Sequence, residues 1–178
     1  MTELAKRYGG SLYELAAEEN LSARLLAELD TAVDSFQREP GYLRLLSAPN
    51  LPKSERRALL DEAFAGAHPY TVNFLKILCD EGALRELPGC ARAYRDLYNR
   101  DNGIVEVQAA VAAPLSAEAT ARLEKALRAR TGKEVELTVR VEPGLLGGIR
   151  LNMDGVQLDG TVRRRLDALK AELNAAVL

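Results

Sequence analysis

The side chains that most catalytic sites depend on are scarce in this sequence. It contains one histidine, His68, two cysteines, Cys79 and Cys90, and no tryptophan. A tetrahedral zinc site would need all three of these residues plus a carboxylate, and neither C-x-x-C nor H-E-x-x-H spacing is present. A single histidine also leaves no convincing set of nucleophile, base and orienting acid. We therefore expect a binding or scaffold protein with no catalytic residues, no metal and no cofactor.

Long apolar runs and an excess of positive charge are lacking as well. The apolar runs fall far short of the roughly 20 residues that cross a bilayer, so we expect no direct membrane insertion. The N-terminus, Met1-Thr2-Glu3, does not have the profile of a secretory signal. Lys and Arg number 24 against 26 Asp and Glu, and this net charge of −2 disfavours general nucleic-acid binding. Two cysteines are too few for a disulfide framework, and we expect both to be buried and reduced.

What the sequence does have is an ordinary globular composition. Hydrophobic residues make up 47% and charged residues 28% of its 178 residues. Aromatics are only 5%, so Leu, Ala and Val must build the core. The apolar spacing is helical up to about Asn102 and changes to a period of two after Gly103. These patterns predict an α+β protein of two small domains, residues 1–103 and 104–178.

Six short helices are predicted in the first domain, where they form a compact bundle bounded by Pro and Gly breaks. The fifth helix is apolar on nearly every side, which is typical of a helix that is central in a bundle or covered by a partner. The first predicted helix ends near Asn20, and the second has its apolar face from Leu25 to Phe36 and stops before Pro40. The third runs from Tyr42 to Ser47, and the fourth has Pro52 in its first turn and an apolar face that ends at Phe64. The fifth runs from about Tyr70 to Glu81, and the sixth has its apolar face from Leu84 to Tyr98, with Pro88 in its first turn or at a kink.

The second domain is predicted to run strand, helix, strand, strand, strand, helix. Ser116 is predicted to be the N-cap of its first helix, and Gly132 to end that helix. Asp154-Gly155 is a strong hairpin signal between the last two strands. A final helix is expected from about Thr161. The predicted strands are residues 105–111, 135–141, 149–153 and 156–158.

Two local features invite a functional interpretation. The glycine-rich segment Gly144 to Gly148 runs into a strand and has no Lys-Ser/Thr pair, which favours a turn with positive φ angles over a phosphate-binding loop.

Three successive arginines, Arg163 to Arg165, point to different sides of the last helix. They form either a solvated face or an interface with an acidic partner.

Four segments, taken in order, carry a more specific signal. They are Tyr8 to Ala16, Asn73 to Leu78, Gly147 to Leu151 and Asp159 to Leu166. They are similar, respectively, to A-x-x-Y-A-x-A-L-x-x-x-A, to N-F-L-x-x-L, to G-G-x-x-[IV] and to D-x-S-[IV]-x-x-[RK]-L. Over its whole length the chain thus resembles the delta subunit of bacterial F-type ATP synthase, the counterpart of the mitochondrial oligomycin-sensitivity-conferring protein.

The sequence departs from this family pattern at a few positions. Gly9 and Gly10 stand where the family favours Ala, and each should weaken a helix by about 1 kcal/mol if it lies inside one. Thr161 replaces the usual Ser, and both residues can cap a helix.

The resemblance implies a non-catalytic subunit of the peripheral stalk, on the cytoplasmic face of the bacterial plasma membrane, that resists rotor torque during proton-driven ATP synthesis. It implies that the N-terminal bundle binds N-terminal helices of alpha subunits, in a groove between the first and fifth helices. It also implies that the C-terminal domain binds the b-subunit dimer. The candidate partner-binding residues are Tyr8, Leu12, Leu15, Phe74, Leu75 and Leu78 in the bundle, and Arg163, Arg164, Leu169 and Leu173 on the last helix.

Other interpretations remain open at this point. Each candidate residue of the bundle is equally well explained as plain core. The alternative function is an RNA-associated binding module in which Arg163 to Arg165 contact phosphate, and it predicts steeply salt-dependent RNA binding. A small hydrolase would have to work with His68 alone.

Overall fold

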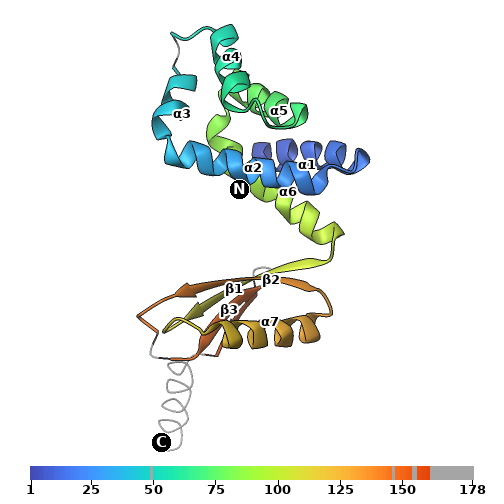
Figure 1. Ribbon diagram of the computed structural model, residues 1–178, viewed down its shortest axis with the longest axis vertical. Coiled ribbons are helices and arrows are strands. Elements are labelled where there is room, and N and C mark those ends of the chain that lie inside the picture. The colour runs from blue at the N-terminus through green and yellow to red at the C-terminus, as the bar shows by residue number, and fades with distance from the viewer. Residues whose placement is uncertain (49, 146, 154–155, 161–178) are drawn as a thin grey trace, which may run out of the picture. The chain divides into compact units, whose positions relative to one another are not determined.

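In a computed structural model, the chain forms two compact units, residues 1–98 and 99–178. The structure describes residues 1–48, 50–145, 147–153 and 156–160. Within these residues it contains seven α-helices, one short 3-10 helix and a four-stranded mixed sheet, so the predicted α+β class is confirmed (Figure 1). In this described part of the chain, every helix is too short or too polar to cross a lipid bilayer.

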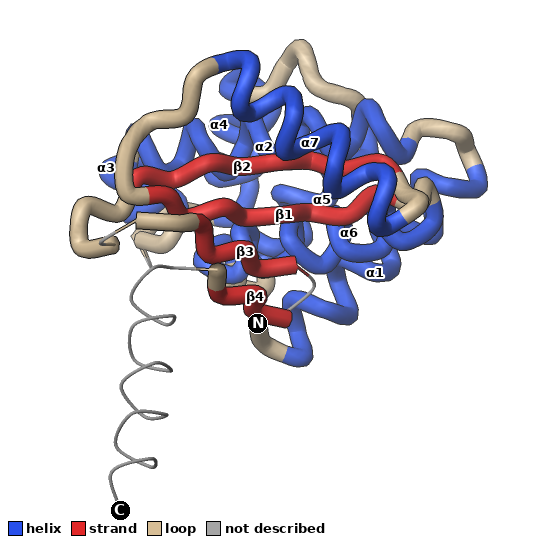
Figure 2. Tube along the Cα trace, turned by 90° about the horizontal axis from the view of Figure 1, so that it is seen from below, coloured by secondary structure: helices blue, strands red, loops and turns tan. Residues whose placement is uncertain are grey.

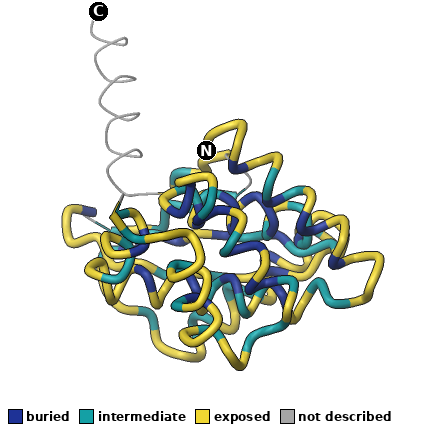
Figure 3. The backbone as a smooth tube through the Cα atoms, turned by 90° about the horizontal axis from the view of Figure 1, so that it is seen from above, coloured by how far each residue is buried: buried dark blue, intermediate teal, exposed yellow. Residues whose placement is uncertain are grey.

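The first unit is built from helices joined by short turns. Its helices pack around one core in which leucines from α2, α4 and α5 are fully buried, among them Leu25, Leu60 and Leu75. Figure 3 shows buried segments alternating with exposed ones along the chain. The helices are α1 (Glu3–Glu18), α2 (Ser22–Arg38), α3 (Pro40–Leu46), α4 (Lys53–Ala63), α5 (Pro69–Asp80), the 3-10 helix η1 (Leu84–Glu86) and α6 (Leu87–Asp101).

Prolines explain why two of the helices begin earlier than predicted. Helix α3 begins at Pro40 rather than Tyr42, and α5 begins at Pro69 rather than Tyr70. Proline suits the first turn because its fixed φ is helical and its missing N–H has no partner there. Pro52 instead precedes α4 as its N-cap. Pro88 lies in the first turn of α6, as predicted, but the preceding turn is the separate helix η1.

Glycine lets α1 and α6 approach closely. A Cβ atom on Gly9 would lie 2.4 Å from the Cys90 carbonyl oxygen and 2.9 Å from the Ala93 Cβ. On the next residue, Gly10, a Cβ atom would only touch Leu97 Cδ1 at 3.8 Å. The two adjacent glycines therefore have different roles, and only Gly9 is required by packing.

The second unit contains a sheet of strand order β2-β1-β3-β4 (Figure 2). Strand β1 pairs in parallel with β2, with Val105 opposite Val135, and antiparallel with β3, with Val107 opposite Met153. Strands β3 and β4 pair antiparallel, as the hairpin signal predicts. The elements are β1 (Ile104–Val111), α7 (Ala117–Thr131), β2 (Glu134–Val141), β3 (Ile149–Met153) and β4 (Val156–Asp159).

Helix α7 connects the parallel strands β1 and β2 and covers one face of the sheet. Leu127 packs with Val105, Val107 and Val135 in a small core, and Leu123 lies against it. Both predicted helix ends are confirmed. The Ser116 hydroxyl accepts a hydrogen bond of 3.2 Å from the Ala119 amide, and Gly132 takes the left-handed conformation, with φ of 66°.

The two glycines directly before β3 have the positive φ angles that the sequence favours. Gly147 and Gly148 have φ angles of 143° and 85°, and the chain then enters β3 directly. The hairpin residues 154–155 and the expected final helix, with Arg163, Arg164, Leu169 and Leu173, lie outside the described residues.

Candidate partner-binding groove

An apolar groove lies between α1 and α5 in the first unit. Its volume is about 490 Å³, within the usual range for ligand pockets. Two stripes of side chains spaced three or four residues apart form its walls, one from each helix. Its lining residues are Arg7, Tyr8, Ser11, Leu12 and Leu15 on α1 and Tyr70, Asn73, Phe74 and Ile77 on α5.

Four of the six bundle residues predicted to bind a partner line this groove. They are Tyr8, Leu12, Leu15 and Phe74. Leu75 and Leu78 do not line it, because both are 0% exposed inside the helical core.

Sequence reasoning omitted Tyr70 and Ile77, whose spacing with Phe74 marks the groove-facing side of α5. The Ile77 side chain is 49% exposed, and Leu15 across the groove is 39% exposed. Large apolar side chains with this much exposure are available for a partner.

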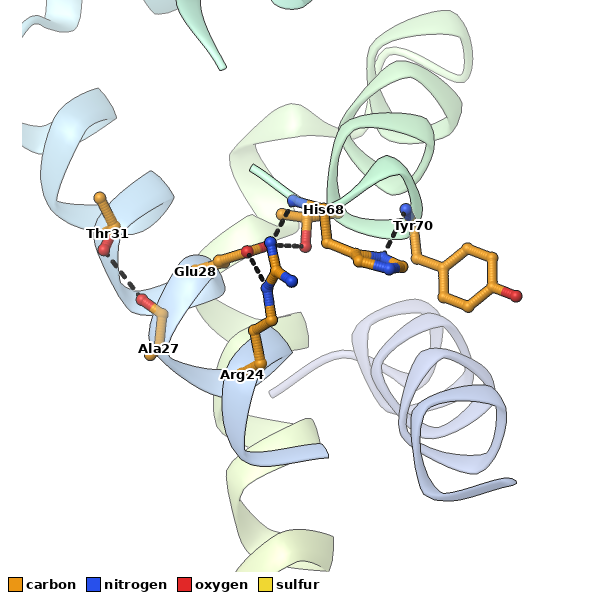
Figure 4. A network of polar contacts seen from close by, with 7 residues as sticks. Arg24, Ala27, Glu28, Thr31, His68 and Tyr70 are labelled. Carbon is orange, nitrogen blue, oxygen red and sulfur yellow. Dashed lines mark hydrogen bonds and ion pairs between the residues drawn. The ribbon is translucent and has the colours of Figure 1, made fainter. Parts of the chain in front are cut away.

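The N-terminus of α5 is tied to α2 through Glu28 (Figure 4). One Glu28 oxygen accepts hydrogen bonds from the His68 backbone amide at 2.9 Å and the Thr71 hydroxyl at 2.6 Å. The other accepts from Arg24 Nε at 3.0 Å. Burial raises the pKa of Glu28, but these hydrogen bonds outweigh it, so the pKa of Glu28 is lowered from its ordinary value.

His68 itself caps α5. Its Nδ1 accepts a hydrogen bond of 3.3 Å from the Tyr70 amide, and its ring lies edge-on to the Tyr70 ring with centroids 4.9 Å apart. The single histidine of the chain therefore positions a groove residue. Among the described residues, no cluster of three His, Cys, Asp or Glu side chains is arranged to hold a metal ion.

Two ion pairs join α5 to α4. Lys76 Nζ lies 2.6 Å from the Asp61 carboxylate, and Arg57 Nε donates to Asp80 at 2.9 Å. The hydrogen bond from Arg57 lowers the pKa of Asp80. With the Glu28 network, these contacts connect α5 to α2 and α4 at both ends and along one side.

The α1 wall is held through aromatic packing. The Tyr13 and Tyr94 rings meet edge to face with centroids 5.3 Å apart, and the Tyr94 hydroxyl donates to the Ser22 carbonyl at 2.9 Å. Burial raises the pKa of Tyr94. Burial also raises the pKa of the Cys90 thiol to about 11, so this cysteine is a protonated core residue at neutral pH.

Comparison with known proteins gives consistent matches along the chain. Residues 4–173 match the family described as ATP synthase delta (OSCP) subunit. The ATP synthase subunit delta of Desulfitobacterium hafniense is 34% identical, covering 97% of this chain and 97% of that protein. The corresponding subunit of Lysinibacillus sphaericus is 32% identical, covering 96% of each.

Solved structures agree with these matches at the level of fold. A chain of the Toxoplasma gondii mitochondrial ATP synthase hexamer has a TM-score of 0.70 at 22% identity, covering 97% of this chain and 98% of that one. A chain of the Polytomella F-ATP synthase has a TM-score of 0.50 at 25% identity and covers 55% of this chain and 88% of that one.

Proposed function

Because the chain belongs to the family of ATP synthase delta (OSCP) subunits, we propose that it serves as a non-catalytic connector in the peripheral stalk of an F-type ATP synthase. Its work is then mechanical. It keeps the catalytic head from turning with the rotor, so that rotation drives ATP synthesis. In a bacterium, this places it at the cytoplasmic face of the plasma membrane, attached through other subunits.

The α1–α5 groove is the observation that carries this proposal. Amphipathic helices bind in apolar grooves through side chains at positions i, i+3 or i+4, and i+7. Tyr8, Leu12 and Leu15 repeat at that spacing on one wall, and Tyr70, Phe74 and Ile77 on the other. We assign the groove to the N-terminal helix of an alpha subunit in the catalytic head, with residues 1–103 as the head-binding bundle.

The second unit, residues 104–178, is assigned to the b-subunit dimer. The support is the family pattern in Asp159 to Leu166 and the apolar spacing of Leu169 and Leu173 in the sequence. On this proposal Arg163 and Arg164 meet acidic groups of the b subunits. The relatives named above are all ATP synthase subunits, which leaves the RNA-associated alternative without support.

Replacing Ile77 by Asp tests the groove directly. We expect the full chain to bind a peptide of the alpha-subunit N-terminus from the same organism, and Ile77→Asp to weaken that binding about tenfold or more by placing a charge in an apolar contact. Calorimetry measures the affinity, and circular dichroism checks the fold.

Leu45 supplies a matched control for this test. It is 45% exposed, on α3, and does not line the groove. Leu45→Asp should leave the affinity unchanged. Absence of peptide binding to the unmodified chain, or equal losses in both variants, would refute the head-binding assignment.

A further inference from the structure

Arg7 has an unusual position in the α1–α5 groove. It is the only charged side chain among the described residues that line the groove. Its guanidinium carbon lies 5.6 Å from the centroid of the neighbouring Tyr8 ring, so the cation rests on a groove residue. Within the described part of the chain, no carboxylate forms an ion pair with it.

The lysine side chains near Arg7 on α1 and on α5 each form an ion pair with a carboxylate. Lys6 Nζ lies 2.7 Å from Glu3 on α1, and Lys76 on α5 is paired with Asp61. Arg7 therefore contributes a positive charge without an ion-pair partner at one end of a groove whose other lining residues are uncharged and mostly apolar. A partner that buries this surface must either supply a negative charge or leave the arginine partly desolvated.

We propose that Arg7 selects the helix that binds in the groove and fixes its direction, by pairing with an acidic side chain at one end of that helix's apolar face. This inference rests on the proposed head-binding function. Arg7 and Tyr8 stand at one end of the α1 stripe, and Leu15 stands at the other, about two helical turns or 10 Å away. The acidic end of the bound helix consequently lies beside Tyr8, and its uncharged end lies beside Leu15.

The charge pair of Arg7 contributes more to selecting one direction of the bound helix than to the affinity of the groove for that helix. Apolar stripes of this kind accept a helix in either direction, since leucine contacts have little directional preference. A single charge pair next to an apolar wall breaks this symmetry, because the reversed helix leaves both charges without a partner. The Tyr8 ring helps by holding the guanidinium in place before binding.

A charge-reversal cycle on the full chain tests the proposal. The probe is a labelled peptide of the alpha-subunit N-terminus from the same organism, and fluorescence anisotropy measures its affinity at low salt. We expect Arg7→Glu to weaken binding about tenfold. Changing the matching acidic residue of the peptide to Lys should restore most of this loss against Arg7→Glu. The same peptide should bind the unmodified chain poorly.

Lys6→Glu is the matched control, because it makes the same change of net charge one residue away and outside the groove lining. We expect it to change the affinity less than twofold. Equal losses in Arg7→Glu and Lys6→Glu, no rescue by any acidic-to-Lys peptide, or tight binding of a peptide without acidic residues would each overturn the role of Arg7 and leave the head-binding function standing. Absence of peptide binding to the unmodified chain would overturn both.

Discussion

At the residue scale, the glycine pair in α1 shows where sequence reasoning ends. Helix propensity treats Gly9 and Gly10 alike, as two weak points of about 1 kcal/mol each. The structure separates them, because the Gly9 Cα faces the backbone of α6 and the Gly10 Cα does not. A close approach between two helices leaves no periodic signature in the sequence of either one. Propensity alone therefore does not predict what a Cβ atom would meet at Gly9.

Substituting the two glycines should change stability in opposite directions. Gly9→Ala should destabilise the first unit by about 1–3 kcal/mol, since its Cβ overlaps the Cys90 carbonyl oxygen. Gly10→Ala should stabilise it by about 0.5–1 kcal/mol through reduced backbone entropy in the unfolded chain. Urea unfolding measures both, and effects of the same sign would contradict the packing described for α1 and α6.

Glu28 gives the first unit a defined response to acid. Its folded-state pKa lies below the ordinary value near 4.5, so its stabilising contribution is present above about pH 4.5 and is lost as the pH falls through the lower folded-state value. Glu28→Gln should cost about 1–2 kcal/mol at pH 7 through weaker hydrogen bonds to Thr71, His68 and Arg24.

The Glu28 prediction is checked by unfolding the unmodified chain and Glu28→Gln at several pH values. The difference in stability should be full at pH 7 and should shrink as the pH falls below about 4.5, because Glu28 is protonated first in the unfolded chain and then in the folded one. Glu14→Gln, at an exposed position of α1, serves as the control with little effect at either pH. A difference that stays constant with pH would show that the charge of Glu28 has no part in holding α5.

At the scale of single elements, the apolar periodicity of the sequence predicts where strands and helices lie. It does not predict which neighbours each side chain contacts. The alternation in residues 105–111 and 135–141 predicted the parallel pair β1 and β2, and Ser116 and Gly132 marked the ends of α7. The fifth helix is the instructive case. Its sequence shows apolar side chains all round, but only tertiary contacts show that Leu75 and Leu78 face the core while Ile77 faces the groove.

The N-cap of α7 is open to a simple test. Ser116→Ala should cost about 1 kcal/mol, because it removes the acceptor for the Ala119 amide. Ser116→Asp should keep the cap and place a negative charge at the positive end of the helix, so its stability should match or exceed that of the unmodified chain. Hydrogen exchange of the first-turn amides reports the effect locally. Equal protection in Ser116→Ala and the unmodified chain would rule out a stabilising cap.

At the scale of the whole molecule, the change of apolar period and the boundary between the compact units fall at different residues of the chain. The shift of apolar period at Gly103 marks the end of α6 closely, whereas the compact units meet between Tyr98 and Asn99, inside the last turns of that helix. Asn99 belongs with the second unit, where its side-chain amide donates to Glu106 at 2.9 Å. Such a hydrogen bond depends on tertiary structure, and the helical spacing of α6 gives no sign of it.

The contact at Gly9 bears on how force passes through such a connector. Where side chains separate two helices, changes of side-chain rotamer allow the helices to shift relative to each other when a force acts on them. Where Gly9 meets the Cys90 carbonyl, no side chain intervenes, and main chain rests on main chain. If a partner helix binds against α1 as proposed, a pull on it would reach α6 through this direct backbone contact, which resists movement of the two helices relative to each other.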